Sequence, residues 1–302
     1  MTTPVATSAG MLAGMTLDDG TIVVRRLDSG PNATGSAFSV GYLVRLTDGR
    51  EAFLKAIDFS QALSAADPAR ELQAMTEAFN FERDILAKCH DERLDYVVHA
   101  VHDGKTLVPS MPDGGVVQYL VFELADGDVR SQMQVSQQFD VAFSLRALHN
   151  IAVGMSQLHA SDIAHQDVKP SNVLIFGDKS KLGDLGRASR KGFFPPHEAA
   201  TVAGDPRYAP PELAYGFEDP DWSRRRLGCD LYHLGSMIVF FATGVGTTEL
   251  LSVEIDPSLW PAKWGGTYDA VLPYVRDAFG RVLLRYRAGA PSAFREPLGT
   301  MV

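Results

Sequence analysis

The sequence has very few of the residues that mark secreted, metal-stabilised or nucleic-acid-binding proteins. Only two cysteines occur in 302 residues, Cys89 and Cys229, and they lack the spacing of metal ligands. A disulfide framework and a cysteine-based zinc site are therefore excluded, and free thiols in a reducing compartment are expected. Lys and Arg number 28 against 37 Asp and Glu, giving a formal net charge of −9, and the longest basic run is Arg224–Arg226. Without a basic stripe, neither nucleic acid nor a membrane surface is an expected partner.

Long hydrophobic runs are also scarce. The most apolar run, from Leu231 to Gly244, is shorter than the ~20 residues of a membrane-spanning helix and contains His233, so it predicts a buried core helix. The N-terminus lacks the basic and apolar regions of a secretory signal. Residues 1–20 are therefore expected to form a flexible leader, and the protein is expected to be cytoplasmic.

The order of the predicted elements favours a β-rich lobe followed by a larger helical lobe. Five segments of the first third have the composition of strands: residues 21–27, 38–46, 51–57, 96–102 and 116–123. Apolar residues recur with helical spacing in residues 67–87 and 140–160, and residues 228–243 form the apolar helix noted above. The predicted class is α+β, with one lobe at 21–124 and the other at 125–302.

The most informative stretch is HQDVKPSN, residues 165–172, which follows a long helix and precedes an apolar strand. Gly183-Asp184-Leu185-Gly186 comes shortly after it. Phosphoryl transfer needs a carboxylate at the attacking hydroxyl, oxygen ligands for Mg²⁺ and a cation at the phosphates. Asp167, Asn172, Asp184 and Lys169 supply these chemistries in one short segment of chain.

With these motifs the chain resembles the eukaryotic-type (Hanks-type) protein kinases from about residue 20 onward. The family's H-R-D-x-K-x-x-N loop corresponds to HQDVKPSN, and its D-F-G corresponds to Asp184-Leu185-Gly186. The A-P-E that ends the family's activation segment corresponds to Pro210-Pro211-Glu212. Asp230 matches the helix aspartate that anchors the catalytic loop, and Lys55 in AFLKA matches the strand lysine.

The resemblance implies a bilobal kinase fold and a role for each matching residue. It implies that Asp167 is the catalytic base and that Asn172 and Asp184 bind Mg²⁺, or Mn²⁺ in its place. Lys169 would contact the γ-phosphate of ATP, and Lys55 the α- and β-phosphates. Taken singly, each motif is also compatible with an ordinary turn or surface residue; the order and spacing of all of them favour the kinase interpretation.

The kinase lysine needs a carboxylate partner on the helix at 67–87. Glu71, Glu77 and Glu82 all lie on that helix. Glu82 fits best, because FERDIL precedes the next strand at the family's usual distance. Glu71 and Glu77 are expected to be solvated helix carboxylates.

The adenine site can be placed on the same resemblance. Backbone groups of Glu123 and Ala125 would bind the base, with Phe122 behind it at the gatekeeper position. Asp128 corresponds to a ribose-binding acid, although an exposed turn aspartate is an alternative. Leu174 would form the floor of the pocket, with a plain core position as the alternative.

The glycine-rich loop departs from the family pattern. In residues 30–41 only Gly35 aligns well, and Val40 is expected to contact the nucleotide. Gly41 aligns alternatively with a position that is usually valine, so the register stays open.

Phe53 is a sharper departure, because the family usually has a small alanine at the roof of the adenine pocket. The ring could tilt aside or crowd the base. A pseudokinase or nucleotide-binding scaffold therefore remains the alternative to catalysis, although every charged catalytic position is filled.

Gln166 replaces the arginine that, in the family, clamps a phosphorylated activation segment through charge-assisted hydrogen bonds. A neutral glutamine is a poor substitute for that cation. Activity is therefore expected not to depend strongly on phosphorylation within residues 184–212, at Ser189 or Thr201 for example.

The substrate class follows partly from Lys169, since lysine two residues after the base resembles the serine/threonine kinases. Asp205 stands where such kinases place threonine, a variant similar to the Wee- and Myt-type kinases, some of which modify tyrosine. Small-molecule kinases share the fold but lack the Pro-Glu that this chain has at Pro211-Glu212. Protein serine or threonine hydroxyls are therefore the expected acceptors, autophosphorylation included.

The last expectations concern partners. In the family an arginine near the C-terminus pairs with the activation-segment glutamate, here Glu212, and the candidates are Arg281, Arg285, Arg287 and Arg295. The protein is expected to be a monomer or weak dimer that acts on protein substrates, within a multi-protein system or through a regulator that binds the kinase surface.

Overall fold

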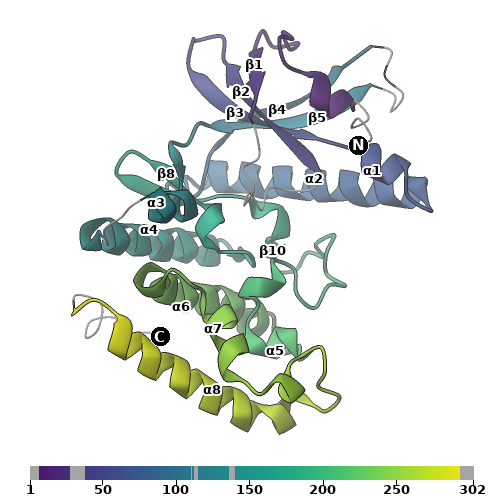
Figure 1. Cartoon of the computed structure of the whole chain (residues 1–302). Coiled ribbons are helices and arrows are strands. Elements are labelled where there is room, and N and C mark those ends of the chain that lie inside the picture. Colours follow the sequence, from purple (N-terminus) through teal and green to yellow (C-terminus); the bar gives the residue numbers. More distant parts are fainter. Residues whose placement is uncertain (1–6, 28–37, 110, 112–114, 136–139, 293–302) are drawn as a thin grey trace, which may run out of the picture. The chain divides into compact units, whose positions relative to one another are not determined.

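The computed structural model describes residues 7–27, 38–109, 111, 115–135 and 140–292. The chain divides into two compact units, Met1–Asp126 and Gly127–Val302. This boundary lies two residues beyond the predicted end of the first lobe at Leu124. Figure 1 labels the elements of both units, and each unit is described by itself below.

The first unit is built on a five-stranded antiparallel sheet with the strand order β1-β2-β3-β5-β4. The strands are β1 (Ile22–Arg26), β2 (Ser39–Arg45), β3 (Glu51–Ile57), β4 (Ala100–Leu107) and β5 (Val116–Glu123). Four of the five predicted strands are confirmed. The strand predicted at 96–102 is displaced to Ala100–Leu107, because β4 is mostly exposed and its polar residues carry no apolar alternation.

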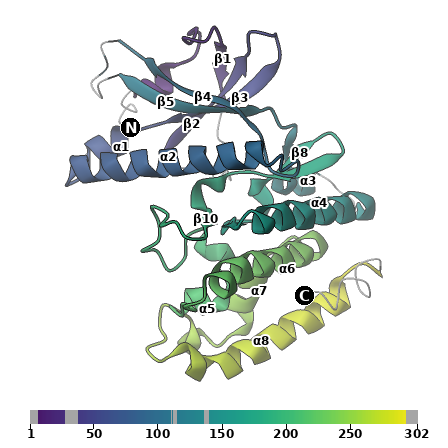
Figure 2. The ribbon, with the colours of Figure 1, turned by 180° about the vertical axis from the view of Figure 1, so that it is seen from behind.

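Helix α2 (Pro68–Asp91) follows the short helix α1 (Ser60–Leu63) and runs along the sheet in both ribbon views (Figures 1 and 2). It begins where predicted, because Asp67 accepts a hydrogen bond from the backbone N–H of Arg70 and Pro68 occupies the first turn. Its buried residues recur every three or four positions: Phe79, Glu82, Ile85, Leu86 and Cys89. One carboxylate, Glu82, is thus carried on the apolar face.

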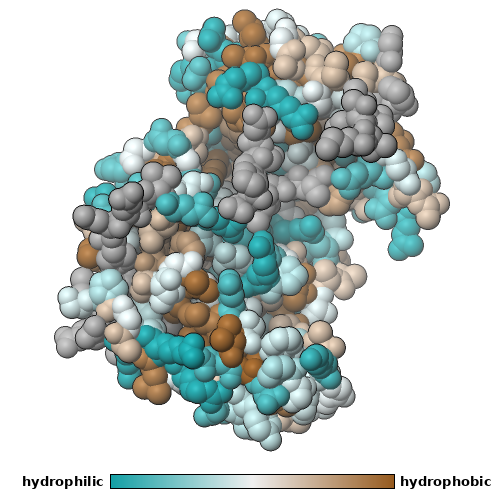
Figure 3. All heavy atoms as spheres, in the orientation of Figure 1, coloured by the Kyte–Doolittle hydropathy of each residue, from teal (hydrophilic) through white to brown (hydrophobic). Residues whose placement is uncertain are grey.

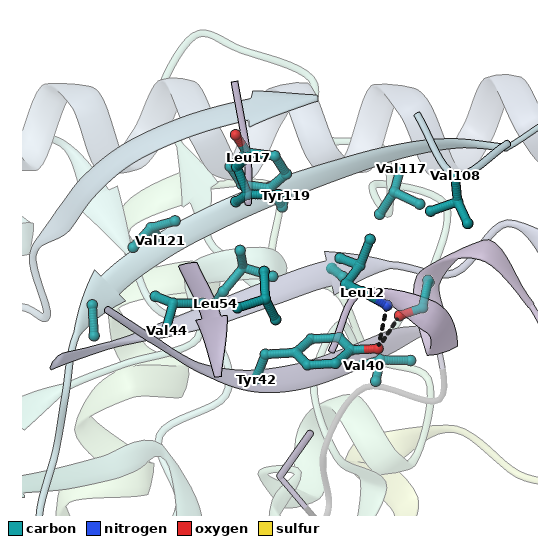
Figure 4. Packing of buried hydrophobic residues seen from close by; sticks show 14 residues of the cluster. Leu12, Leu17, Val40, Tyr42, Val44, Leu54, Val108, Val117, Tyr119 and Val121 are labelled. Atoms are coloured by element: carbon teal, nitrogen blue, oxygen red, sulfur yellow. Dashed lines mark hydrogen bonds between the residues drawn. The ribbon is translucent and has the colours of Figure 1, made fainter. Parts of the chain in front are cut away.

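The N-terminal segment is part of the core, so the expected flexible leader is wrong for residues 7–20. A 3-10 helix, η1 (Ser8–Met11), leads into Leu12 and Leu17, which are almost fully buried with the sheet residues. Tyr42 of β2 donates a hydrogen bond to the carbonyl oxygen of Ala9 at 2.6 Å and accepts one from the N–H of Leu12 at 3.4 Å (Figure 4). This segment covers one face of the sheet and leaves the other face for the site described below.

The second unit is mainly helical. Its helices are α3 (Val129–Val135), α4 (Val141–Ala160), α5 (Pro211–Ala214), α6 (Gly228–Thr243), α7 (Thr247–Glu254) and α8 (Tyr268–Gly289). Its short strands are β6 (Gly127–Asp128), β7 (Ile163–Ala164), β8 (Val173–Phe176), β9 (Lys179–Leu182) and β10 (Ser189–Arg190), in the orders β6-β8-β9 and β10-β7. The predicted helices at 140–160 and 228–243 are confirmed, and Asp140 caps the first of them.

Helix α6 is the buried core helix that its composition predicts. Nine of its residues are buried, among them Asp230 and His233. Within the described ranges, no single helix is long and apolar enough to cross a membrane. The pair Ser223–Thr243 and Thr247–Glu254 meets the length and composition criteria together, with a bend of 80° between its parts.

Candidate active site

In the first unit, Lys55 and Glu82 form a buried ion pair. Lys55 lies on β3 and Glu82 on the apolar face of α2, and the Lys55 Nζ donates to both carboxylate oxygens at 2.8 and 3.0 Å. The two side chains are 13% and 6% exposed. Because a buried charge is costly without a partner, this geometry holds both groups in place.

The other two glutamates considered for this role lie elsewhere on the helix. Glu77 is exposed and accepts a hydrogen bond from Gln73, and Glu71 sits in the exposed first turn. The structure therefore pairs Lys55 with the predicted glutamate.

In the second unit, two predicted residues converge on the carboxylate of a third. Oδ2 of Asp167 accepts hydrogen bonds from Lys169 Nζ at 2.8 Å and from Asn172 Nδ2 at 3.0 Å. Asn172 Nδ2 also donates to the carbonyl oxygen of Asp167 at 2.9 Å, which closes the loop on itself. All three side chains are nearly buried, so the loop holds an oriented carboxylate beside an ammonium group.

Asp230 of α6 holds this loop through hydrogen bonds to its backbone. Its two carboxylate oxygens accept the backbone N–H groups of His165 and Gln166, each at 2.8 Å, and one also contacts His159 Nε2 at 2.9 Å. Burial alone would raise the pKa of Asp230, but the hydrogen bond from His159 and the neighbouring donors hold it below its ordinary value. A charged Asp230 therefore fixes the two residues that precede the base.

The backbone next to the base adopts an uncommon conformation. Gln166 has φ of 67°, in the left-handed region that residues with a Cβ seldom occupy. Such strain persists only where neighbouring contacts enforce it. The hydrogen bonds of Asp230 to this backbone provide that enforcement.

The loop also positions Asp184. The N–H of Gly183 donates to the carbonyl oxygen of Asn172 at 2.9 Å, and the Gly183 carbonyl oxygen contacts His165 Nε2 at 3.0 Å. A carbonyl oxygen only accepts, so Nε2 of His165 carries the proton. Asp184, with φ of 59°, comes directly after this junction.

The residues present fit a magnesium ion that also binds phosphate oxygens. Asn172 donates its amide N–H groups to Asp167, while its amide oxygen accepts the Ser171 hydroxyl at 3.4 Å and has a second lone pair for a metal. One carboxylate and one amide oxygen suit Mg²⁺, which prefers oxygen ligands and keeps several waters or substrate phosphates. In the part of the chain that the structure describes, no cluster of three or more His, Cys, Asp or Glu side chains forms an independent metal site.

Gly204 and Asp205 form a contact with the base that the sequence motifs did not reveal. The N–H of Asp205 donates to Asp167 Oδ1 at 2.9 Å, and its carboxylate lies 3.8 Å from Lys169 Nζ. A Cβ on Gly204 would lie 2.6 Å from Asp167 Oδ1 and 2.5 Å from the carbonyl oxygen of Gln166. Only glycine leaves room for this approach, so the chain at 204–205 is fitted to the base.

The Asp205 carboxylate is itself held by Arg207, whose backbone N–H and guanidinium donate to it at 2.8 to 3.1 Å. Burial would raise the pKa of Asp205, but these hydrogen bonds hold it below its ordinary value. Lys169 thus lies near two carboxylates, that of Asp167 at 2.8 Å and that of Asp205 at 3.8 Å.

Gln166 is linked to the predicted activation segment through Arg226. Gln166 Nε2 donates to the Arg226 carbonyl oxygen at 2.8 Å, and Arg226 Nη1 donates to Gln166 Oε1 at 3.1 Å. The guanidinium, which is fully buried, also donates to Glu198 at 2.9 Å. Arg225 holds the second oxygen of the same carboxylate at 2.8 Å.

A π-helical turn, Ser223–Leu227, lets the consecutive residues Arg225 and Arg226 reach one carboxylate. Such turns are rare and are found mostly at functional sites. The sequence offered one signal for this contact, the run of three arginines, but nothing that indicated its partner.

Val40 and Gly35 are two residues of the first unit predicted to contact the nucleotide. Val40 pairs with Ala56 and belongs to the core cluster with Leu12 (Figure 4). Lys55 is the strand neighbour of Ala56 and so lies on the opposite face of the sheet. The predicted nucleotide contact of Val40 is therefore wrong, because adjacent strand residues point to opposite faces and Gly41 is the residue on the Lys55 side. Gly35 lies outside the described residues.

Glu123 ends the fifth strand, and Ala125 follows two residues later. The Glu123 N–H donates to the His99 carbonyl oxygen at 3.2 Å, and Glu123 Oε1 accepts the His99 N–H at 2.8 Å. The strand end is therefore fixed by its own unit, and Ala125 is half-buried just beyond it.

Asp128 and Leu174 are cross-strand neighbours in the β6–β8 pair, so the structure brings these two predictions together. Leu174 is half-buried. The Asp128 carboxylate accepts hydrogen bonds from the N–H and hydroxyl of Ser131, each at 2.9 Å, and so caps α3. This favours the structural alternative for Asp128 over ribose binding.

The predicted arginine partner of Glu212 is not found among the described residues. Arg281 and Arg285 both pair with Glu254 of α7 instead, at 3.1 and 2.8 Å. Burial raises the pKa of Glu212. Three of the four candidates, Arg281, Arg285 and Arg287, lie on α8, where the first two are directed to α7, and Arg295 lies outside the described residues.

An apolar cavity of about 430 Å³ adjoins the end of the segment 184–212. The segment contributes Val202, Pro206 and Ala209, and α7 contributes Leu251 and Ser252. In the space-filling view, hydrophobic residues gather around the position of α7 (Figure 3). The cavity can take an apolar side chain.

Comparisons with known proteins agree with this arrangement. The family model described as the protein kinase domain matches residues 35–250. The chain is 29% identical over 168 residues to Aurora/IPL1-related protein kinase 2 of Caenorhabditis elegans, which covers 55% of this chain and 52% of that protein. It is 36% identical over 124 residues to serine/threonine-protein kinase Nek3 of Mus musculus, covering 38% and 24%. The chain therefore spans about half the length of the first relative and less of the second.

Proposed function

Because the chain belongs to the protein kinase domain family, we propose that it transfers the γ-phosphate of ATP to serine or threonine hydroxyls of protein substrates. The observation that carries the proposal is the convergence of Lys169 and Asn172 on the carboxylate of Asp167. The buried Lys55–Glu82 pair supports it from the first unit. A binding-only scaffold would have no need for this complete set of charged contacts.

In this mechanism Asp167 orients the acceptor hydroxyl and takes its proton as the Oγ–P bond forms. The bond from the γ-phosphorus to the bridging oxygen breaks in the same step, and ADP leaves with that oxygen. Asp167 is ready for this role because Asn172 and the N–H of Asp205 hold its carboxylate in one orientation. Lys169 sits within hydrogen-bond distance of the base and offsets negative charge that develops on the transferred phosphoryl group. Positioning and charge neutralisation together account for most of the catalysis in this reaction class.

Asn172 and Asp184 would hold Mg²⁺, which supplies positive charge to the β- and γ-phosphate oxygens when bound. Lys55, oriented by Glu82, would bind the α- and β-phosphates. The substrate class rests on Lys169 and on the printed names of the serine/threonine relatives. The apolar cavity beside Pro206 and Ala209 is suited to an apolar side chain of the protein substrate.

Intact mass spectrometry after incubation with Mg²⁺-ATP tests the proposal. The wild type and an exposed control, Asp178→Asn, should gain mass in steps of one phosphate, on the chain itself or on added casein. Asp167→Asn should gain none over the same time, since removal of a general base costs about 10²–10⁴-fold in rate. Peptide mapping then assigns the acceptor as serine, threonine or tyrosine.

Nucleotide binding without any phosphate transfer, by wild type and control alike, would instead support the pseudokinase alternative. Action in the cytoplasm, as a monomer or weak dimer within a multi-protein system, stays a prediction. Fractionation of cells and measurement of molar mass in solution would check it.

A further inference from the structure

Phe53 occupies the centre of the sheet face that carries Lys55. It lies on β3 between Leu43 of β2 and Phe122 of β5, its direct cross-strand partners. Residues two apart on a strand share a face, so Phe53 and Lys55 point to the same side. That side is opposite the core formed by Ala52, Leu54 and Ala56 with the N-terminal segment.

The Phe53 ring is seated over Gly41. A Cβ placed on Gly41 would lie 2.9 Å from Cε2 of the ring, closer than real Cβ atoms approach other atoms, and 3.2 Å from Cζ, which is a tight contact. Gly41 has no left-handed φ, so the glycine provides space for the ring in its present position and does not serve backbone conformation. The large residue at position 53 and the absent side chain at 41 are therefore complementary in volume.

The contact with Gly41 defines the direction of the Phe53 ring. Gly41 pairs with Lys55, next to Phe53 on the neighbouring strand, so the ring leans across β2. Its centroid is 6.3 Å from that of Phe122 with the planes inclined by 36°, and Phe53 itself is only half-buried. One surface of the ring thus remains open on the Lys55 face, instead of filling the sheet's core.

We propose that the Phe53 ring is the group that stacks on the nucleotide base, and that Gly41 is kept free of a side chain to seat it. The inference rests on the proposed function, which places ATP on the Lys55 face. The family resemblance leads one to expect an aliphatic side chain at each of positions 41 and 53, both in contact with the base. In this chain the base contacts the Phe53 ring instead. An aromatic ring stacks better on a two-ring purine than on a pyrimidine, so ATP and GTP should bind more tightly than CTP.

A double-mutant cycle tests whether the Phe53 ring fills the space left by the missing side chain at Gly41. Mg²⁺-ADP affinity is measured by calorimetry for the wild type, Phe53→Ala, Gly41→Val and the double variant. Phe53→Ala should bind about tenfold more weakly, since it removes a stacking contact. Gly41→Val should bind more weakly still and melt at a lower temperature, because valine meets the ring.

The double variant should recover affinity to within a few-fold of the wild type, since valine then occupies the space that the ring vacates. If the Phe53 ring occupies the space over Gly41, the two substitutions must compensate each other in this way, and their effects on affinity must not simply add. Phe53→Leu separates the effect of stacking from that of side-chain volume. It should melt near the wild-type temperature, because leucine fills much of the space of the ring, but it should not keep the preference for ADP over CDP. Phe194→Ala, which removes a ring that is 92% exposed, is the matched control and should bind like the wild type.

Two results would overturn the inference alone: additive effects in the cycle, or tighter ADP binding by Phe53→Ala, which would show that the ring obstructs the base. A wild type that binds no nucleotide, although it melts cooperatively, would refute the proposed function and this inference with it. Binding by the wild type and loss on Lys55→Met would leave the proposed function standing whatever the cycle shows.

Discussion

Arg226 and Glu198 form a 2.9 Å salt bridge between a fully buried guanidinium and a carboxylate of the segment 184–212. The same guanidinium donates to Gln166, the residue before the base. A carboxylate of the chain thus holds the segment 184–212 by charge-assisted hydrogen bonds. We expect Arg226, which reaches this place from the turn before α6, to take the role that the resemblance gives to an arginine at position 166.

Glu198→Gln should therefore reduce both activity and stability. It removes the negative charge that compensates a buried cation and leaves the segment 184–212 without this anchor. The free energy of unfolding should fall by about 1–3 kcal/mol, a moderate loss because Glu198 is itself partly exposed. Turnover should fall about tenfold, since the orientation of Gln166 and the base depends on this contact. Phosphate transfer to casein and urea unfolding measure the two effects.

Glu218→Gln is the matched control for this change. Glu218 pairs with Arg225 at 2.7 Å but makes no contact with Arg226 or Gln166. The pair is more exposed, so its loss should cost less than about 1 kcal/mol and leave turnover unchanged. Equal losses of turnover in the two variants would show that general charge balance matters and that the link to Gln166 does not.

Removal of Ser189 and Thr201 should leave turnover within a few-fold of the wild type. Ser189 is 1% exposed, and its hydroxyl accepts a hydrogen bond from the Trp222 indole N–H at 3.1 Å, so a kinase could not reach it in the folded protein. With Glu198 already bound to Arg226, no phosphate is needed at either position. Activity of the double alanine variant, measured before and after phosphatase treatment, checks this. Complete loss of turnover would contradict the role assigned to Glu198.

The sequence was sufficient for those features that depend on local pattern. The catalytic loop and Asp184 lie at helix and strand boundaries with fixed spacing, and Glu82 falls on the apolar face of an amphipathic helix. Their placement follows from motif order and from the resemblance to the kinase family, which sets the distance of Glu82 from the next strand.

The features that the sequence missed all depend on contacts between distant segments. Leu12 and Leu17 show no periodicity, yet they are buried because a sheet face needed cover. Glu198 and Arg226 are 28 residues apart with nothing local to connect them. The seat of Phe53 over Gly41 depends on the pairing of β2 with β3, whereas the sequence left open how Gly41 aligns with the family's glycine-rich loop.

Gly204→Ala should nearly abolish turnover, because the added methyl group would overlap the Gln166 carbonyl oxygen and Asp167. The backbone at 204 must move away, which also displaces the N–H of Asp205 from the base. A displacement of this size next to the reacting groups costs about 10²-fold or more in rate. Gly235→Ala in α6, where a Cβ meets nothing within 4 Å, is the control and should be neutral or about 1 kcal/mol stabilising. Wild-type turnover in Gly204→Ala would show that the segment can shift freely.

His197 gives the fold a pH dependence of known sign. Burial is the main cause that lowers its pKa to about 4 from 6.5, and the positive charges of Arg187 and Arg226 add to it, against the opposing charge of Glu198. Between pH 6.5 and about 4 the unfolded chain binds a proton here that the folded protein does not. The free energy of unfolding should therefore fall as the pH falls through this window.

His197→Gln removes this titration and keeps a polar side chain of similar size. Its unfolding free energy should change less between pH 7 and pH 5 than that of the wild type, by about 1–2 kcal/mol. Contributions from carboxylates are common to both proteins and cancel in the comparison. His149→Gln, a substitution on the exposed side of α4, is the matched control and should keep the wild-type pH dependence of unfolding. Urea unfolding at the two pH values measures all three proteins, and equal slopes for the wild type and His197→Gln would show that His197 is protonated as readily in the folded protein as in the unfolded chain.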